Sequence, residues 1–335
     1  SGMGYVAPNP MVGALLVYEQ KVIGEGFHKK YGESHAEVNC IKSVNAENKS
    51  LIERSTMYVS LEPCSHYGKT PPCADLILEN KINRVVIGCK DINEKVSGRG
   101  IRKLQEAGVN VVTGILEKEC VELNKRFFTF HQKKRSYVIL KWAQTADRKI
   151  GSENEKRVFI SSEYSNRLVH KWRSEEAAIM VGTHTAIKDN PSLTTRLWRG
   201  KNPMRIVIDK NLKLPLTLNL FDAESSTIVV NTIKDSSEKN IRYIKIDDGN
   251  LLDQMLKQLY ESEVQSILVE GGTKTLQSFI DKGFWDEARI ITNEKMSLGK
   301  GIDSPKLKGG VMILDQEYES DRICYYKNTS ELNTL

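Results

Sequence analysis

Three short segments in the first quarter of the chain carry side chains that can hold a metal ion and move a proton. They are His35-Ala36-Glu37, Glu62-Pro63-Cys64 and Pro71-Pro72-Cys73. One imidazole nitrogen and two thiolates supply three ligands to a tetrahedral Zn²⁺ and leave its fourth position for water, which is the arrangement of a catalytic zinc. Zinc lowers the pKa of that water toward about 7. Glu37, two residues after His35, can then carry a proton from the water to a leaving amine.

Each segment is ambiguous by itself. Most His-x-Glu pairs are ordinary surface residues, and zinc-binding cysteines are more often two to four residues apart, whereas eight residues separate Cys64 from Cys73. The three segments together, at predicted junctions between strands and helices, predict a catalytic zinc bound by His35, Cys64 and Cys73. Glu37 is the predicted catalytic residue. The remaining cysteines have no such neighbours and are predicted to be reduced thiols: Cys40, Cys89, Cys120 and Cys324.

A glycine-rich segment in the second half can hold a phosphate. Residues 270–276 (EGGTKTL) follow an apolar stretch typical of a buried strand and open a predicted helix. Glycines let a phosphate approach the backbone, and a helix N-terminus offers N–H groups and partial positive charge. An ordinary glycine-rich turn with a threonine cap explains the segment equally well. No G-x-G-x-x-G follows any predicted strand, so the common doubly wound dinucleotide fold is not supported.

Alternating strands and helices must position these residues in the first half. Strands are predicted at 12–18, 21–27, 56–60, 84–88 and 109–113, and helices at 36–43, 73–79 and 101–107. Only Glu19 and Gln20 separate the first two strands, which favours a hairpin. The alternation predicts a three-layer α/β domain.

The pattern is interrupted at residues 132–136 (QKKRS), a polar stretch without periodicity that predicts a linker. It divides the chain into domains at residues 1–134 and 136–335. Beyond it, strands are predicted at 137–141, 178–182, 205–209, 227–231, 243–246 and 266–270, and helices at 162–174, 251–260 and 273–280. The second domain is therefore also expected to be α/β.

Composition excludes several classes of protein. The chain has 335 residues, of which 39% are hydrophobic and 27% charged, unlike disordered, collagen or coiled-coil chains. No stretch has the roughly 18 uninterrupted apolar residues of a membrane helix, and no secretory signal opens the chain, so a cytoplasmic enzyme is expected. The net charge of +6 and the small basic cluster at 133–135 argue against a nucleic-acid track. They leave room for a small phosphorylated substrate.

The metal-binding segments resemble the zinc-dependent cytidine deaminase superfamily, whose general signature is H-x-E…P-C-x-x-C. The longer cysteine spacing in LEPCSHYGKTPPC at 61–73 resembles one branch, the bifunctional deaminase–reductases of riboflavin biosynthesis, as do APNPMVG at 7–13 and GEGFH at 24–28. The resemblance implies hydrolytic removal of the 2-amino group of 2,5-diamino-6-(5-phosphoribosylamino)pyrimidin-4(3H)-one. It also implies substrate contacts from Asn9, His66, Lys69, Asp91 and Asn93. Family members have a helix before the first of these motifs, and without it we expect a weaker deaminase fold or interface.

The second half resembles the reductase part of the same family. KWAQTAD at 141–147, FISS at 159–162 and VGTHTAIKDNPSLTTR at 181–196 carry this resemblance. It implies a dihydrofolate-reductase-like α/β fold that binds NADPH and reduces the ribosyl group of 5-amino-6-(5-phosphoribosylamino)uracil to ribityl. The implied NADPH contacts are Ala143, Phe159, Thr185, Asp189, Gly272, Thr273, Lys274, Thr275, Leu276, Gln277 and Ser278. The implied substrate contacts are Arg173, Leu193, Arg196 and Glu270.

Some roles within the reductase half stay open. Arg173 and Arg196 are expected to form a bidentate clamp on the substrate phosphate. Asp189 and Glu270 are both candidates for the general acid. Arg157 is either a third phosphate ligand or a surface residue. The family likeness also implies a homodimer or a higher homo-oligomer.

Two other functions remain as alternatives. A nucleic-acid base deaminase with an appended binding domain would need a basic, aromatic-lined groove, and no cluster of arginine and aromatic residues surrounds residues 61–73. A zinc-stabilised interaction module would need four protein ligands and a closed site, whereas only three candidate ligands carry motif context. Metal analysis, followed by assay with a phosphoribosylaminopyrimidine and NADPH, separates the three hypotheses.

Overall fold

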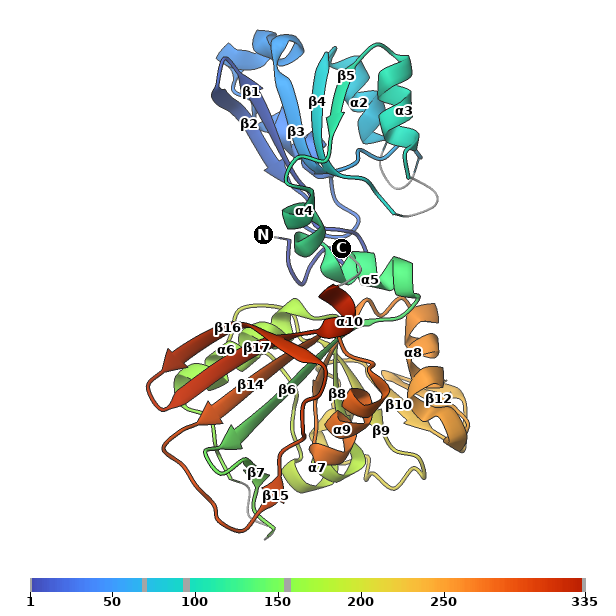
Figure 1. The fold of residues 1–335 in the computed structure, drawn as a ribbon. Helices are drawn as coiled ribbons and strands as arrows, with labels where there is room; N and C mark the ends of the chain where they lie inside the picture. Colours follow the sequence, from blue (N-terminus) through green and yellow to red (C-terminus); the bar gives the residue numbers. More distant parts are fainter. Residues whose placement is uncertain (1, 68–70, 93–96, 154–157, 333–335) are drawn as a thin grey trace. The chain divides into compact units, whose positions relative to one another are not determined.

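The chain forms two compact units, Ser1–Lys134 and Arg135–Leu335 (Figure 1). The structure is a computed structural model that describes residues 2–67, 71–92, 97–153 and 158–332. Each unit has its own sheet and its own hydrophobic core, so each is described by itself. Three residues with expected roles, Lys69, Asn93 and Arg157, lie outside the described residues.

The boundary between the units falls inside the predicted linker, but most of that stretch belongs to ordered structure. Helix α5 (Lys125–Lys133) includes its first two residues. The Arg135 guanidinium donates to both carboxylate oxygens of Asp286, at 2.7 and 2.8 Å, and Ser136 Oγ donates to a backbone oxygen of the second unit at 2.6 Å. The polar sequence therefore reflects a helix end followed by a partly buried ion pair, and Lys134 alone connects them.

The first unit is built on a five-stranded sheet in the order β2-β1-β3-β4-β5. Its strands are β1 (Gly13–Tyr18), β2 (Lys21–Phe27), β3 (Thr56–Leu61), β4 (Arg84–Cys89) and β5 (Asn110–Thr113). β1 and β2 form the expected antiparallel hairpin, and β3, β4 and β5 run parallel. Each strand begins and ends within one residue of its predicted position, because each is a short run rich in apolar or β-branched residues between polar or glycine-containing segments.

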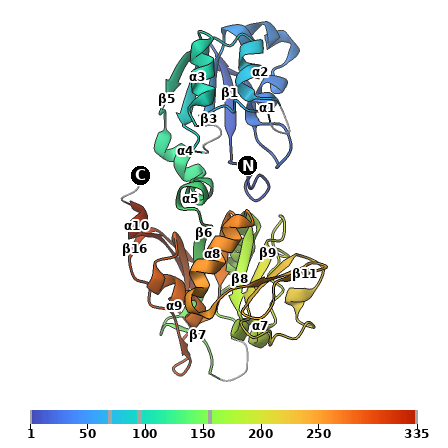
Figure 2. The same cartoon turned by 90° about the vertical axis from the view of Figure 1, so that its right-hand side faces the viewer.

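Helices cover one face of this sheet completely and the other in part (Figure 2). The helices are α1 (Ala36–Ser43), the 3-10 helix η1 (Ala46–Arg54), α2 (Cys73–Glu79), α3 (Arg99–Glu106), α4 (Glu117–Leu123) and α5. Leu16, Met57 and Ile87 point from the strands into a core that they share with α1, α2 and α3. On the opposite face, α4 and α5 pack over Leu61 and Cys89 at the ends of β3 and β4.

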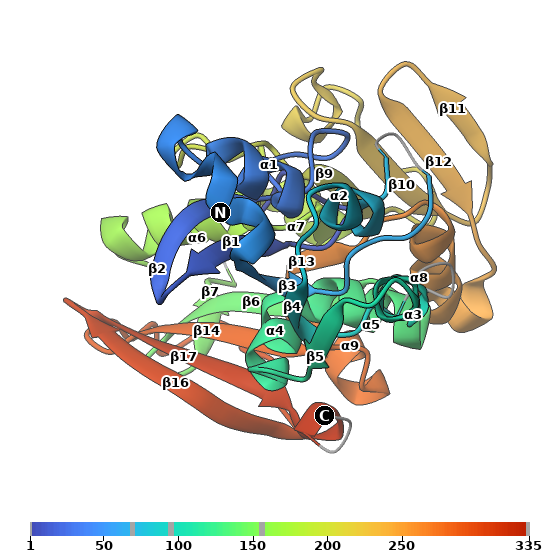
Figure 3. The same cartoon turned by 90° about the horizontal axis from the view of Figure 1, so that it is seen from above.

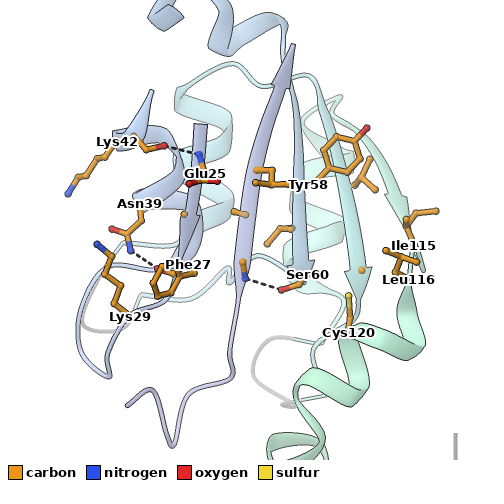
Figure 4. Close-up of a pocket in the computed structure, with 18 residues that line it drawn as sticks. Glu25, Phe27, Lys29, Asn39, Lys42, Tyr58, Ser60, Ile115, Leu116 and Cys120 are labelled. Atoms are coloured by element: carbon orange, nitrogen blue, oxygen red, sulfur yellow. Dashed lines mark hydrogen bonds between the residues drawn. The ribbon is translucent and has the colours of Figure 1, made fainter. Parts of the chain in front are cut away.

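The rest of that opposite face is open and hollowed. A cavity of about 850 Å³ is lined by the partly exposed side chains of Leu15, Phe27 and Tyr58, and by Ile115 and Leu116 before α4 (Figure 4). The third layer of the expected three-layer domain is therefore only partial within the described residues. The predicted metal ligands are not among the residues that line this hollow.

The second unit is built on a ten-stranded sheet in the order β11-β12-β10-β9-β8-β13-β6-β14-β17-β16. Its strands are β6 (Tyr137–Thr145), β8 (Ala178–Gly182), β9 (Met204–Ile208), β10 (Thr227–Asn231), β11 (Ser236–Glu238), β12 (Ile241–Lys245), β13 (Ser266–Glu270), β14 (Glu287–Asn293), β16 (Gly310–Tyr318) and β17 (Asp321–Asn328). Neighbours from β12 to β14 are parallel, and β11, β17 and β16 join antiparallel. Two short strands, β7 (Lys149–Gly151) and β15 (Ile302–Asp303), pair separately.

Helices lie on both faces of the large sheet (Figure 3). They are α6 (Glu163–Glu175) and α7 (Thr183–Asp189) on one face, α8 (Leu251–Glu261) and α9 (Thr273–Lys282) on the other, and the short α10 (Thr329–Leu332) after the last strand. Central strand β8 is apolar throughout, and β13 is apolar between Ser266 and Glu270, because both faces of these strands are covered. Among the described residues, no helix has the length and apolar character needed to span a membrane.

The sequence patterns do not predict the strands at one end of this sheet. β14, β16 and β17 are additional, and β6 continues four residues beyond its expected end at Lys141. Charged residues interrupt the apolar positions of these strands, and β16 is exposed along most of its length. Their place in the sheet depends on pairing with distant strands, which local periodicity does not report.

Candidate active sites

The three candidate metal ligands come from the starts of two helices and from the loop between a strand and a helix. His35 immediately precedes α1, Cys73 is the first residue of α2, and Cys64 follows β3. In α/β sheets, ligands bind outside the carboxyl ends of the strands, where such junctions gather. The fold therefore brings the three side chains to one place although His35 and Cys73 are 38 positions apart.

The spacing of the three donor atoms suits a single tetrahedral ion. His35 Nδ1 lies 3.5 Å from Cys64 Sγ and 3.4 Å from Cys73 Sγ, and the three donor atoms lie within 4.8 Å of one another. Zn–S and Zn–N bonds of about 2.3 and about 2.0 Å at a tetrahedral angle place nitrogen and sulfur about 3.5 Å apart. The residues therefore fit Zn²⁺ with three protein ligands, which leaves a fourth position for water.

The Cys64 sulfur is stabilised as a thiolate by its surroundings. It accepts the backbone N–H of Cys73 at 3.3 Å, at the N-terminus of α2. A hydrogen bond with the Cys73 thiol, helped by His35, lowers the pKa of Cys64 to about 4. The same hydrogen bond, together with burial, raises the pKa of Cys73. The two sulfurs therefore share a proton that a bound cation would displace.

Glu37 lies in the first turn of α1 and is only 3% exposed. Burial raises the pKa of its carboxyl group above the ordinary value, and the Cys73 thiol lies within hydrogen-bonding reach. Glu37 is not one of the three clustered ligands. A buried carboxyl group beside a metal site, with a raised pKa, is suited to take up and return a proton.

Asn9 is connected to the metal site through a histidine that the sequence argument did not single out. Asn9 Nδ2 lies 3.2 Å from His28 Nε2, and His28 Nδ1 lies 3.1 Å from the Ser34 backbone oxygen. The His28 and His35 rings are 5.3 Å apart, centre to centre. His28 is 3% exposed and directly follows β2. It is the last residue of the GEGFH motif, and this place in the motif is the sequence feature that could have identified it.

Glu62, which the sequence argument named in its segment without giving it a role, organises the loop around Asp91. Its carboxylate accepts backbone N–H groups from Asp91 at 3.3 Å, Gly98 at 2.9 Å and Gly100 at 2.9 Å. Asp91 itself is 7% exposed. A side chain at Gly100 would collide with the backbone oxygen of Pro63, so the start of α3 packs directly against the cysteine loop. His66 lies in that same loop and is exposed.

In the second unit, Arg173 and Glu270 form a buried ion pair. Arg173 Nε and Nη2 donate to the two Glu270 carboxylate oxygens at 2.8 and 2.9 Å, and Arg173 Nη1 donates to the Thr194 backbone oxygen at 3.2 Å. Lys141 Nζ lies 3.6 Å from Glu270 Oε2. Burial alone would raise the pKa of Glu270, but Arg173 and Lys141 lower it to about 2.

This ion pair changes two sequence-based expectations. Arg173 directs its donors to protein groups, so the expected clamp of Arg173 and Arg196 on one phosphate is not formed in this structure. Arg173 instead holds the segment that carries Leu193 and the exposed Arg196. Glu270 is held as a carboxylate, which has no proton to donate, so it does not fit the role of general acid.

His170 joins the same cluster, one helical turn before Arg173 on α6. It is 1% exposed, and its Nδ1 has no hydrogen-bond partner among the described residues. Burial, with the nearby Arg173 and Arg196 charges, lowers the pKa of His170 to about 4. The sequence argument missed His170, because a histidine within a helix is more often a core residue than a site residue.

The expected NADPH segment lies at the start of α9, beside α7. Gly272 precedes the helix, and its backbone N–H donates to Thr185 Oγ1 at 3.1 Å. A Cβ added at Gly182 would lie 2.6 Å from Thr275 Oγ1, so the end of β8 and the start of α9 touch. The first-turn N–H groups of a helix have no partner within the helix, so this junction can accept an anionic group.

Three of the expected NADPH contacts have side chains that point away from the start of α9. Leu276 is completely buried in the core between α9 and the sheet, so its side chain cannot contact a cofactor. Gln277 bonds the backbone of Lys306, and Ser278 Oγ donates to the Thr275 backbone oxygen. The turn of the helix carries these three side chains away from its N-terminus. The contact expected of Leu276 can therefore come only from its backbone.

The remaining expected contacts are scattered around that junction. Ala143 lies in β6 and Asp189 is the last residue of α7. Phe159 is 76% exposed, and Thr273 Oγ1 donates to the Asp303 backbone oxygen. Lys274 is exposed at the first turn of α9. Contact between these side chains and NADPH remains a prediction.

Comparisons with known proteins find a matching family for each of the two units. The RibD C-terminal domain family matches residues 136–312, and the cytidine and deoxycytidylate deaminase zinc-binding region matches residues 3–89. Riboflavin biosynthesis protein RibD of Aquifex aeolicus is 40% identical over 306 residues, which cover 89% of this chain and 84% of that protein. RibD of Escherichia coli is 32% identical over 307 residues, covering 86% and 83%.

Solved structures agree as well. A diaminohydroxyphosphoribosylaminopyrimidine deaminase/5-amino-6-(5-phosphoribosylamino)uracil reductase from Thermotoga maritima superimposes with a TM-score of 0.88 at 34% identity, covering 98% of this chain and 94% of that one. Acinetobacter baumannii RibD gives 0.87 at 26% identity, covering 97% and 94%. The expected fold class, a deaminase domain followed by a reductase domain, is confirmed.

Proposed function

The chain belongs to the RibD family of bifunctional deaminase–reductases in riboflavin biosynthesis, and we propose that its two units divide these reactions near residue 135. The first unit contains the candidate zinc ligands and Glu37, and the second contains the Arg173–Glu270 pair and the start of α9. All six cysteines are free thiols in the structure, which supports a cytoplasmic location.

The first unit removes the 2-amino group of 2,5-diamino-6-(5-phosphoribosylamino)pyrimidin-4(3H)-one. The observation that carries this proposal is the tetrahedral spacing of the His35, Cys64 and Cys73 donors beside a buried glutamate. When bound, Zn²⁺ would supply a water whose pKa is lowered toward about 7. Glu37 takes the proton of the attacking water and returns it to the amino nitrogen, which leaves as ammonia.

Other residues of this unit hold the pyrimidine. Asn9, fixed by His28, is placed to hold the edge of the base, and His66 and Lys69 of the cysteine loop are proposed to meet the ring or its phosphorylated arm. Asp91 and Asn93 are proposed ribose contacts. Support for the Asp91 assignment comes from Glu62, because its hydrogen bonds hold the Asp91 loop against the segment that carries Cys64.

The second unit reduces 5-amino-6-(5-phosphoribosylamino)uracil with NADPH. NADPH would supply a hydride to C1′ of the sugar and become NADP⁺, the bond from C1′ to the ring oxygen would break, and that oxygen would take a proton, which gives the ribityl chain. The start of α9, with Thr185, is proposed to bind the cofactor phosphates. Arg196 and Leu193 are proposed to contact substrate on the segment that Arg173 holds.

The proton source for this step is proposed to be Lys141 rather than Glu270. Lys141 Nζ lies beside Glu270 at 3.6 Å, and burial lowers the pKa of its ammonium group, which makes it a better acid. Asp189, at the end of α7, remains the other candidate. The nucleic-acid deaminase alternative loses its support, because residues 136–312 match a reductase family.

The test is to supply the diaminopyrimidine phosphoribosyl substrate and NADPH to the full chain and to follow ammonia and NADPH separately. We expect ammonia release first and NADPH oxidation only afterwards. Cys64→Ser should abolish ammonia release and still reduce substrate that is already deaminated. Cys40→Ser, which removes a buried thiol outside the ligand cluster, is the control and should keep both activities. Loss of both activities in Cys64→Ser, with the second unit folded, contradicts the proposed division.

A further inference from the structure

Residues 7–12 (APNPMV), the segment that carries Asn9, have little regular structure of their own. The segment precedes β1 and belongs to neither a helix nor a strand, and Pro8 and Pro10 have no backbone N–H group to donate. Asn9 donates its backbone N–H to the nearby Val6 oxygen at 2.8 Å. The position of the Asn9 side chain therefore depends on how other parts of the chain hold this backbone.

Asn124 holds the segment at Met11, through both ends of its side-chain amide. Asn124 Oδ1 accepts the backbone N–H of Met11 at 2.7 Å, and Asn124 Nδ2 donates to the Met11 backbone oxygen at 2.8 Å. A side-chain amide has the same donor and acceptor as a peptide group, so it satisfies Met11 as a residue of a neighbouring strand would. Asn124 is 2% exposed and lies 113 positions from Met11.

Asn124 is itself fixed between two helices. It follows α4 and precedes α5. Its backbone N–H donates to the Val121 oxygen at 3.0 Å, and its backbone oxygen accepts the N–H of Phe128 at 2.9 Å. The side chain and the backbone of this buried residue are therefore both bonded, and the position of α5 determines where Met11 is held.

The apolar cluster beneath α5 connects this position to the other segments of the candidate deaminase site. Its members come from α5, from the last residues of β3 and β4, and from two loops that pack against it: Phe127, Phe128, Leu61, Cys89, Val12 and Ile92. β3 leads into the loop that carries Cys64, and β4 leads into the loop that carries Asp91. The start of α5 therefore contacts the Asn9 segment, the cysteine loop and the Asp91 loop together.

The Met11 contact supports Asn9 and its histidine partner at once. Asn9 Nδ2 lies 3.2 Å from His28 Nε2, and the backbone N–H of His28 donates to the Val12 oxygen at 3.0 Å. On the other side of Val12, Gly13 donates its backbone N–H to Ser60 Oγ at 3.0 Å (Figure 4). Loss of the Asn124 bonds would free the backbone between Asn9 and these later contacts.

We propose that Asn124 is a positioning residue for deamination, which fixes the backbone at Met11 so that the Asn9 amide meets the edge of the pyrimidine. This role rests on the deamination proposed above. Asn9 holds the base in the bound substrate and in the transition state alike, so its displacement weakens both equally. The consequence is a higher KM for the pyrimidine with little change in kcat.

The test follows ammonia release by the full, zinc-loaded chain over a range of concentrations of the diaminopyrimidine substrate. Asn124→Ala should raise the KM by roughly 5–150-fold, the range that corresponds to the loss of two ordinary hydrogen bonds. Its kcat should change by less than about 3-fold, and its zinc content and its reduction of deaminated substrate should equal those of the parent. Hydrogen exchange at the Met11 amide, which Asn124 protects, should be faster.

Asn80→Ala is the matched control. Asn80 Nδ2 also donates to a backbone oxygen, that of Leu76 at 2.8 Å, but Asn80 lies at the end of α2 and outside the α5 cluster. This variant loses a comparable structural hydrogen bond in the same unit. Its KM for the pyrimidine and its exchange at Met11 should both stay at the parent values.

A double variant separates a role through Asn9 from a general structural one. Asn9→Ala should itself raise the KM. If Asn124 acts through Asn9, the protein with both Asn9→Ala and Asn124→Ala should have a KM within about 2-fold of that of Asn9→Ala alone. Asn124→Asp keeps the shape of the side chain and the acceptor for Met11 but turns an oxygen toward the Met11 carbonyl. It should raise the KM as well, and it replaces Asn124→Ala if that protein does not fold.

Three results overturn the positioning role: an unchanged KM in the Asn124 variants, a loss confined to kcat or to zinc content, or Asn9 and Asn124 effects that multiply in the double variant. Failure of the underlying deamination looks different, because the parent chain would then release no ammonia from the diaminopyrimidine substrate. That result would overturn both proposals before any variant is compared.

Discussion

Glu37 is the residue on which the proposed deamination depends most directly, because it is buried beside the metal ligands without belonging to them. Glu37→Gln keeps the shape of the side chain and removes its ability to carry a proton. We expect deamination to fall by roughly 10²–10⁴-fold, the usual contribution of a general acid–base group. Ammonia release under single-turnover conditions measures the effect.

Zinc content distinguishes this role from ligation. The Glu37→Gln protein should bind one zinc per chain, as the parent does, and should reduce deaminated substrate at the parent rate. A variant that loses its zinc would identify Glu37 as a ligand, and the proton-transfer role would then be wrong.

Arg196 is an exposed cation on the proposed substrate segment of the reductase unit, and Arg173 is paired with Glu270. If Arg196 grips the substrate phosphate, Arg196→Ala removes a charge-assisted hydrogen bond of about 1.5–3 kcal/mol, and kcat/KM should fall by roughly 10–150-fold. Because the phosphate is remote from C1′, most of the loss should appear as a higher KM for the pyrimidine. Steady-state kinetics with each substrate varied provide the measurement.

The KM for NADPH is the internal control for Arg196→Ala and should hardly change. A large rise in that constant, with the pyrimidine constants unaltered, would place Arg196 on the cofactor phosphate instead. Arg199, which is also exposed three residues further along, offers a matched variant, and Arg199→Ala should leave both constants unchanged.

At the scale of elements, the Arg173–Glu270 pair ties α6 to the end of β13 and to the Thr194 segment. Both side chains are about nine-tenths buried. Arg173→Ala leaves the Glu270 charge without its main partner, so the free energy of unfolding of the second unit should fall by about 3–5 kcal/mol. Arg196→Ala, at an exposed position nearby, should change it by less than about 0.5 kcal/mol. Chemical denaturation of the two variants provides the comparison.

A double substitution tests whether the unpaired Glu270 charge causes the stability loss expected for Arg173→Ala. Arg173→Met with Glu270→Met removes both charges, and its stability loss should be clearly smaller than that of Arg173→Ala. Equal losses in the two proteins would show that packing, rather than an uncompensated charge, dominates at this position.

His170 makes the stability of α6 depend on pH. Its pKa is lowered from 6.5 to about 4 in the folded chain. Between these values the unfolded chain binds a proton that the folded chain does not, so stability must fall as the pH falls from 6.5 to about 4. The shift corresponds to a loss on the order of 3 kcal/mol. His170→Gln should flatten this part of the curve of unfolding free energy against pH.

The exposed His184 of α7 provides the comparison for His170. His184→Gln should leave the acid limb of the stability curve as it is in the parent. If His170→Gln also leaves it unchanged, then other groups are responsible for the acid sensitivity of the second unit.

At the scale of the whole molecule, two units with separate cores should respond separately to loss of metal. Zinc binds the folded first unit, so its removal should lower that unit's stability by about 4 kcal/mol if zinc is present at about 1,000 times its dissociation constant. Calorimetry with and without a chelator should show one transition moving down and the other staying in place.

Cys64→Ser identifies which transition belongs to which unit. The variant should show the lowered transition without any chelator, and chelation should not move it further. If both transitions move together on chelation, the units unfold cooperatively, and the separation into independent units would not hold for stability.

The sequence alone determined the features that depend on neighbouring residues. Short runs rich in apolar or β-branched residues located β1 to β5 to within one residue, because such runs form strands where polar or glycine-containing segments bound them. The spacing of His35, Cys64 and Cys73, with Glu37 nearby, indicated a zinc site because few other functions require those side chains together. The apolar stretches that form β8 and β13 likewise indicated buried strands of an α/β domain.

Tertiary structure alone decided which distant groups meet. Arg173 and Glu270 are 97 positions apart, and their pairing turned an expected phosphate clamp and an expected acid into an ion pair. Glu62, His28 and the exposed β16 edge also acquired their surroundings only through folding. The physical reason is that hydrogen-bond partners, burial and pKa depend on long-range packing, whereas periodicity and motif spacing report only what lies nearby along the chain.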